Sequence, residues 1–106
     1  MWMFNRLFGP SIYLLILDNF LDRPEEFMNL REIARLVDKN PGSVSRVLPR
    51  LVEEGLVQQI QVGRTMFAFH LNVEDELVKL LTDFRKKLQE FQGETTIKRT
   101  VVKANE

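Results

Sequence analysis

The stretch LREIARLVDKNPGSVSRVLPRLVEEGLV, residues 30–57, contains the pattern that decides the fold. Its apolar residues form two groups, each spaced i, i+3, i+4, i+7, and this spacing places each group along one face of a short helix. The groups are Leu30, Ile33, Ala34 and Val37, and then Val44, Val47, Leu48 and Leu51. Between them lies the turn sequence DKNPG, in which Asn40 is a good N-cap and Pro41 suits the first helical position. The pattern predicts a helix-turn-helix.

The second of these helices, residues 41–54, has hydroxyl and guanidinium groups on the side that its apolar residues leave free. They belong to Ser43, Ser45, Arg46 and Arg50. Such groups bind DNA phosphates and the edges of bases. A plain helical hairpin within a small bundle is the alternative, and the polar face favours DNA binding over it.

A β-hairpin is predicted directly after the second helix. Gly55 is the expected helix stop. Residues 57–71 then contain two runs in which apolar side chains alternate with others, separated by Gly63 and Arg64. A hairpin in this position is a wing.

The two ends of the chain carry further apolar patterns. Residues 11–21 predict a buried first helix, entered through Gly9 and Pro10. The aromatic leader before it, with Trp2 and Phe4, is expected to pack on another subunit or on the C-terminal helix. A signal peptide is not favoured, because acidic residues interrupt the apolar run and it is too short to span a bilayer.

The C-terminal helix is expected over residues 73–92, capped by Asn72 and ended by Gly93. Its apolar residues recur at intervals of 4, 3, 4 and 3, which is a heptad seam suited to dimerisation. The expected dimer-interface residues are Trp2, Phe4, Leu77, Leu81, Phe84, Leu88 and Phe91. A helix folded back on its own core is the alternative. The tail, residues 93–106, is predicted to be either a disordered segment or a final edge strand.

Composition limits the classes of function. The 106 residues suffice for one domain, and 15 basic residues balance 15 acidic ones, which argues against a protein that coats DNA without specificity. There is no cysteine, consistent with a reducing cytoplasm, and His70 is the single histidine. The residues that catalysis, a metal or a cofactor would need do not converge, so we predict no enzyme, no metal site and no cofactor.

The order of elements, with PGSVSRVL followed by EEGLV and then VGRT, resembles the winged-helix transcription regulators of the ArsR and MarR type. The resemblance covers roughly residues 10–71. It implies that helix 41–54 enters the major groove and that the wing, residues 57–71, reaches the DNA backbone or minor groove. The DNA-binding residues that follow are Lys39, Asn40, Ser43, Ser45, Arg46, Arg50 and Arg64. Pro49 departs from the pattern, since proline removes a helical hydrogen bond to Ser45 and is expected to kink or end the helix.

The sequence thus predicts an α+β, mostly α fold: a winged helix-turn-helix with a two-stranded wing and a long C-terminal dimerisation helix. Residues 1–92 form one DNA-binding domain that includes that helix. The expected function is a homodimeric, sequence-specific transcription regulator that acts as a repressor on double-stranded DNA in the cytoplasm, away from membranes. The alternatives are an architectural DNA-binding protein and a winged-helix module that binds other proteins. The sequence does not indicate whether a small-molecule effector is sensed.

Overall fold

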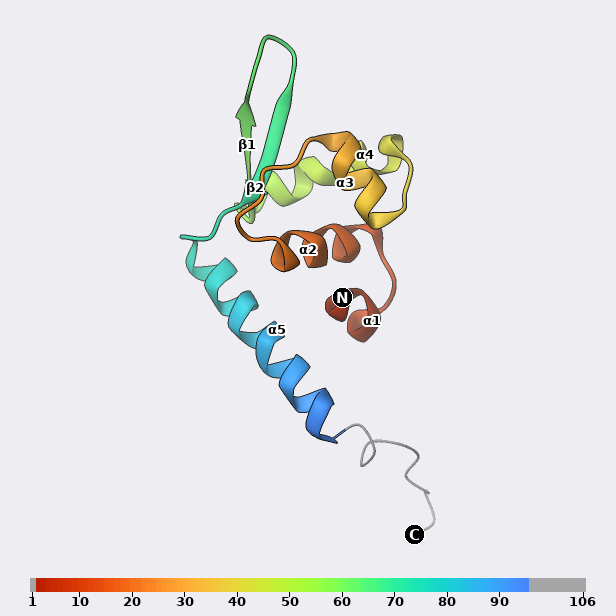
Figure 1. Ribbon diagram of the computed structural model, residues 1–106, viewed down its shortest axis with the longest axis vertical. Coiled ribbons are helices and arrows are strands. Elements are labelled where there is room, and N and C mark those ends of the chain that lie inside the picture. Colours follow the sequence, from red (N-terminus) through yellow and green to blue (C-terminus); the bar gives the residue numbers. More distant parts are fainter. Residues whose placement is uncertain (1, 96–106) are drawn as a thin grey trace.

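A computed structural model of the chain describes residues 2–95, with side chains as far as Phe91 (Figure 1). Along this part of the chain, the elements run in the order α1 Met3–Phe8, α2 Ile12–Asp22, α3 Leu30–Val37, α4 Pro41–Glu53, β1 Val57–Gln61, β2 Phe67–Leu71 and α5 Glu76–Thr95. Helices α2, α3 and α4 pack together, and the wing and α5 start on the same side of this cluster and point in opposite directions. The predicted winged helix-turn-helix is confirmed.

Side-chain caps mark the starts of both helices of the helix-turn-helix. The Asn29 side chain accepts a hydrogen bond from the backbone N–H of Glu32, and Glu32 accepts one from the N–H of Asn29, which completes a capping box. At α4, the Asn40 side chain accepts from the N–H of Ser43, and Pro41 occupies the first turn. Asp38 adopts a left-handed conformation (φ 57°) that reverses the chain between the helices.

The core forms where the apolar faces of α2, α3 and α4 meet. Ile33, Val44 and Leu51 are fully buried, and Ala34 is 3% exposed at the crossing of α3 and α4. Phe20 and Ile16 of α2 fill the space beneath them. Burial of this kind contributes about 1.5–3 kcal/mol per large apolar side chain, so α4 is anchored along its inner face and can present its outer face to solvent.

The wing is an antiparallel hairpin in which Val57 pairs with Leu71 and Gln61 with Phe67. A short bridge that the sequence analysis missed joins Met28 to Phe69, with backbone hydrogen bonds of 2.9 and 2.8 Å in the two directions. The loop before α3 is therefore a third strand-like segment on the free edge of β2. It attaches the base of the wing to the helix-turn-helix.

Two predicted boundaries of the C-terminal helix were wrong. Asn72 does not cap α5; its amide donates to the carbonyl of Gly55 (2.9 Å), while Asp75 accepts from the N–H groups of Leu77 and Val78 at 3.0 and 3.2 Å. Nor does Gly93 end the helix, which continues to Thr95. A glycine costs only about 1 kcal/mol inside a helix, so a single one need not stop it. The rest of the predicted tail, residues 96–106, lies outside the described residues.

The apolar stripe of α5 is wider than the face that contacts the winged core. Leu81 and Leu88 are partly buried against that core, alongside the fully buried Val78. The exposed apolar residues of the helix form what we call the outer row: Leu77, Leu80, Phe84 and Phe91. Three of these recur every seven residues and therefore lie on one side of the helix. Some residues of the predicted seam thus pack against the core of their own chain, and the others are exposed. For the residues that pack inward, the alternative of a helix folded back on its own core holds.

The aromatic leader forms a helix, α1, that the sequence analysis did not assign. Phe4 is 2% exposed and stacks on Phe84, with ring centroids 6.2 Å apart. Of the two expected partners for the leader, it is thus the C-terminal helix of the same chain that Phe4 contacts. Phe4 is buried within one protomer, so its predicted place on a dimer surface was wrong. Trp2 is half-buried against the same core.

Pro49 lies inside α4, and the helix continues past it to Glu53. Of the two expected effects of Pro49, a kink or an end of the helix, the second does not occur. Its ring still removes the hydrogen bond that residue 49 would donate to the Ser45 carbonyl. We expect Pro49→Ala to raise the free energy of unfolding by about 1–3 kcal/mol, because the restored bond and the better helix propensity of alanine act together. Thermal unfolding would measure the gain, and an unchanged or lower Tm would contradict it.

Among the described residues, no helix is both long enough and apolar enough to cross a membrane.

Candidate DNA-binding surface

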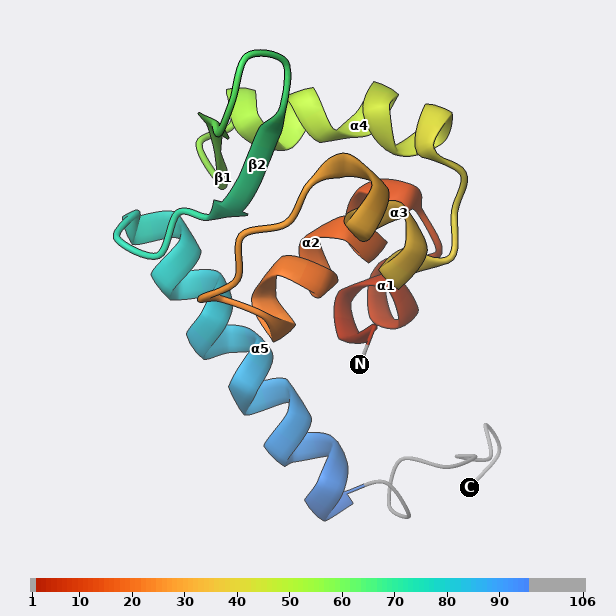
Figure 2. The same cartoon turned by 45° about the horizontal axis from the view of Figure 1, so that its top comes forward.

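The outer face of α4 centres on Arg46. Successive helical residues are rotated by about 100°, which places Arg46 opposite Val44 and Leu48, the residues that anchor the helix. Arg46 is exposed, as Ser45 and Arg50 are on either side of it. In Figure 2 α4 runs along the outside of the helical cluster with the wing beside one end. A guanidinium held there can reach into a groove of DNA without displacing any core residue.

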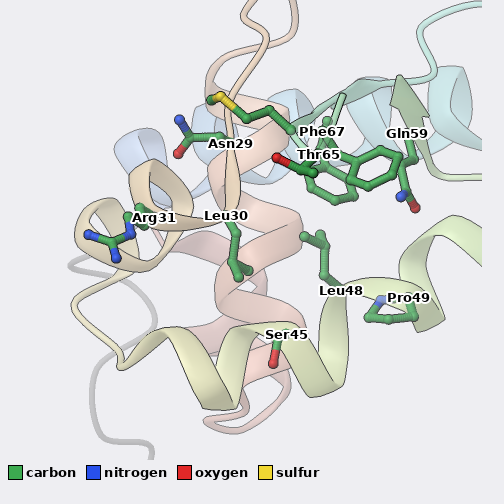
Figure 3. A pocket seen from close by; sticks show the side chains of 11 residues that line it. Asn29, Leu30, Arg31, Ser45, Leu48, Pro49, Gln59, Thr65 and Phe67 are labelled. Carbon is green, nitrogen blue, oxygen red and sulfur yellow. The ribbon is translucent and has the colours of Figure 1, made fainter. Parts of the chain in front are cut away.

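Ser45 lies on the flank of α4 that faces the wing. Its hydroxyl donates to the carbonyl of Gly42 (2.9 Å), a bond within the first turns of the helix. Behind it, a cleft of about 460 Å³ separates α4 from the wing. Figure 3 shows Leu30 and Leu48 pointing into this cleft below Phe67, whereas Ser45 points outward. Because α4 and the wing line different sides of the cleft, each could contact DNA at a separate place.

Arg50 occupies the opposite flank, beside α2. Its guanidinium carbon lies 5.4 Å from the ring centroid of Tyr13, a cation–π contact. Burial raises the pKa of the Tyr13 hydroxyl; Glu54 adds to this rise and Arg50 opposes it. The hydroxyl therefore stays protonated at neutral pH and can donate a hydrogen bond. With its side chain held over the ring, Arg50 is suited to a backbone phosphate at the edge of the groove more than to a base.

The remaining predicted DNA-binding residues lie around the first turn of α4 and at the wing tip. Lys39 and Asn40 are exposed in the turn, while Ser43 is half-buried. The side-chain oxygen of Asn40 is used in capping, which leaves its amide NH₂ to contact a ligand. Arg64 is exposed in the loop between β1 and β2, where its carbonyl accepts from the Gln61 side chain (2.9 Å) and steadies the turn.

Charge makes the C-terminal end of α4 the least favourable part of the surface for DNA. Glu53 and Glu54 end the helix and would repel phosphates there. Arg46, by contrast, lies one turn into the helix, where no acidic residue precedes it. The part of α4 around Arg46 is therefore better suited to phosphates than its C-terminal end.

Sequence reasoning missed two residues at this surface. Arg31, exposed in the first turn of α3, borders the cleft beside Ser45, and Figure 3 shows its guanidinium pointing away from the cleft into solvent. Tyr13 supports Arg50 from another helix. Arg31 could have been found as a basic residue on the polar side of its helix, but no local signal predicts the pairing of Tyr13 with a residue 37 positions away.

His70 is placed where the sequence predicted, on β2. Its ring lies 4.5 Å from that of Phe27, and its Nδ1 is 3.1 Å from the carbonyl oxygen of Leu71. Within residues 2–91, no group of three histidine, cysteine, aspartate or glutamate side chains is arranged to hold a metal ion.

Residues 12–61 match a family model described as the IclR helix-turn-helix domain. This match covers helices α2 to α4 and the first strand of the wing. The similarity is thus to the IclR type, and the more specific resemblance to the ArsR and MarR type is not supported. Comparison with curated protein sequences gave no match.

Solved structures with the same fold come from archaea and bacteria. A possible transcriptional regulator from Methanosarcina mazei Go1 is 12% identical with a TM-score of 0.60, and the match covers 94% of this chain and 87% of that one. The transcriptional regulator BldR from Sulfolobus solfataricus is 13% identical with a TM-score of 0.61, over 97% and 71% of the two chains. RV1404 from Mycobacterium tuberculosis is 14% identical with a TM-score of 0.65, over 94% and 67%. At these identities the likeness shows the fold.

The fold, the polar face of α4 and the family match together define the class: a DNA-binding transcription regulator of the helix-turn-helix type. Proteins of this class are not enzymes. Within the class, residues 12–61 are similar to the IclR helix-turn-helix domain.

Proposed function

We propose that this protein is a homodimeric, sequence-specific repressor that reads the major groove with α4 and contacts the backbone or minor groove with the wing. The observation that carries the proposal is the position of Arg46, exposed at the centre of a helix face whose opposite side is buried. An arginine in this position can bind guanine through two hydrogen bonds. The proposed contact residues are Lys39, Asn40, Ser43, Ser45, Arg46, Arg50 and Arg64, acting on DNA in the cytoplasm.

The outer row of α5 supports the dimer. Leu80 is 67% exposed, and the other three members are 45–47% exposed, which is more apolar surface than a helix of a monomer usually leaves wet. Phe8 of α1 adds to the exposed apolar area; its ring lies 5.6 Å from that of Phe4, which also stacks on Phe84. We propose that a second copy of the chain covers this surface. Residues 1–92 then act as one unit for DNA binding and dimerisation.

Dimerisation follows from the needs of recognition. One helix reads only a few base pairs, too few to select one site in a genome. A two-fold dimer presents two copies of α4 to successive major grooves, about 34 Å apart on a pseudo-palindrome. Repression then follows if the bound dimer excludes the polymerase from a promoter.

Selection of bound fragments from random DNA tests the proposal. We expect enrichment of a pseudo-palindrome whose half-sites are about one helical turn apart. A reporter gene behind the selected site should lose expression when the protein is supplied. No enriched motif would contradict sequence-specific binding, and raised expression would contradict repression.

The wing should contribute affinity more than specificity. Arg64 lies in a turn at the wing tip, where a phosphate is the nearest DNA group in the proposed complex. We expect Arg64→Ala to weaken binding to all sequences about equally and to reduce the slope of log K against log salt by about one unit. Titrations on operator and on random DNA at several salt concentrations would measure both effects. A change of sequence preference with an unchanged salt slope would contradict the assignment.

A further inference from the structure

A buried ionic junction joins α1, α2 and α5. Asp18 of α2 is fully buried, and its carboxylate accepts hydrogen bonds from the N–H groups of Phe4 (2.9 Å) and Asn5 (2.8 Å). The same carboxylate accepts from Nε of Arg85 (2.9 Å), a residue of α5 that is 5% exposed. Arg85 also donates from Nη2 to Asp22 (2.8 Å), one turn along α2 from Asp18. Arg85 thus bridges two carboxylates of one helix.

This geometry constrains the orientation of the Arg85 guanidinium as well as its distance from α2. A guanidinium is planar and its N–H groups point in fixed directions, so two carboxylates one turn apart on α2 define both its position and its plane. An apolar contact imposes no such direction, because neighbouring side chains can slide past one another at little cost. Polar groups buried in an interface serve in some proteins to select one register among several.

Besides this junction, apolar contacts join the described part of α5 to the winged core. Val78, Leu81 and Leu88 are the apolar residues of α5 that pack against the core, and Phe84 adds the ring contact with Phe4. Arg85 lies near the middle of α5, and the C-terminal end of this helix extends away from the cluster (Figure 1). The angle at which the far half of α5 leaves the domain therefore depends on the junction.

We propose that Arg85, with Asp18 and Asp22, is a positioning element that sets the angle of α5 and so the distance between the two copies of α4 in the dimer. The junction determines which half-site spacing the protein accepts. This inference rests on the proposed dimer through the outer row, because α5 is then the connection between the two winged domains. The residues of the junction touch no DNA; they act through α5.

The test uses the full chain and a series of palindromes. Each palindrome carries the selected half-site, and the centre-to-centre spacing changes one base pair at a time. We expect the wild type to bind best at one spacing and at least tenfold more weakly two base pairs away. Asp22→Asn and Arg85→Lys each weaken or remove one of the two contacts by which Arg85 bridges the carboxylates. The affinity of these variants for the palindromes should therefore vary less than threefold over the same range of spacings. Binding to a single half-site should be unchanged.

Asp83→Asn is the matched control. It removes one negative charge from an exposed ion pair on α5, Asp83 with Lys87 at 3.4 Å, and should leave the spacing curve as in the wild type. The side chain of Asp22 is 26% exposed, so its substitution perturbs the fold less than a change at Asp18 and provides the test if Arg85→Lys fails to fold. A folded Asp22→Asn protein with the wild-type spacing curve would overturn the inference.

A second readout does not involve DNA. The chain has no cysteine, so pairs of spin labels can be placed at Glu53→Cys on α4 and Gln89→Cys on α5, both exposed positions. With labelled protein diluted into unlabelled, the distance distribution within a protomer should be narrow in the wild type and broader in Asp22→Asn. Equal widths would also overturn the inference. A wild type that is monomeric, or that has no spacing preference, would instead contradict the proposed function.

Discussion

We expect the Arg46→Ala protein to bind its operator on the order of 5- to 150-fold more weakly than the wild type, a loss of about 1–3 kcal/mol. The reason is that Arg46 is exposed at the centre of the outer face of α4, where a guanidinium can form two hydrogen bonds with guanine. Titration of operator DNA and of operators with single base-pair changes would measure the loss. The same variant should stop discriminating at one base pair of each half-site.

Lys86→Ala is the control for this experiment. It also removes one positive charge from an exposed position, but on α5, away from α4. We expect little change in its affinity at moderate salt, because exposed charges more than about 10 Å apart are largely screened at 0.1 M. Since Arg46 is exposed, its truncation should leave the Tm close to that of the wild type. An Arg46→Ala protein with wild-type affinity and specificity would remove the central claim of the proposed function.

The second large effect should come from the outer row. We expect Leu80→Glu with Phe91→Glu to give a folded monomer, because two charges buried at a helix seam oppose association, whereas both positions are exposed in the single protomer. Specific binding should then fall toward the non-specific level, with dissociation constants of about 10⁻⁴ to 10⁻⁶ M at physiological salt. Sedimentation would measure the assembly state, and circular dichroism would show that the fold is retained.

A matched control adds the same charge elsewhere on α5. Thr82→Glu with Gln89→Glu introduces two acids at exposed positions that are rotated away from the outer row. This protein should remain a dimer and bind its operator. A wild type that sediments as a monomer at micromolar concentration, yet binds its operator tightly, would contradict the dimer. So would a Leu80→Glu, Phe91→Glu protein that remains dimeric.

The helix-turn-helix and the wing could be predicted from the sequence because their signals are local. Asn29 with Glu32 and Asn40 with Pro41 mark helix starts within four residues, and Gly55 follows the last turn of α4 with a φ of 79°. The apolar spacing of α3 and α4 also predicted which of their sides would be buried. With those sides buried, the exposure of Arg46 followed directly.

Local sequence signals did not predict how the C-terminal helix packs. Its periodicity identified one apolar stripe, but a stripe does not say which of its residues meet the chain's own core. Leu81 and Leu88 turned inward, while Leu80, which lies outside the 4-3 pattern, is the most exposed apolar residue of the helix. Asn72 and Asp75 are both good caps, and the backbone path after β2 placed Asp75 at the helix start and Asn72 against Gly55.

The sequence by itself determined the helix-turn-helix, the wing and the face of α4 that meets solvent, because caps, turns and periodicity act between residues a few positions apart. Only the tertiary structure decided which residues fill the junction of α1, α2 and α5. Asp18 is an acidic residue that interrupts the apolar run of residues 11–21, and no local pattern marks Arg85 as buried, yet the two are buried together across 67 positions of sequence. Arg50 likewise meets Tyr13 from another helix. Such pairings depend on how the helices pack in space, and no spacing within one helix encodes them.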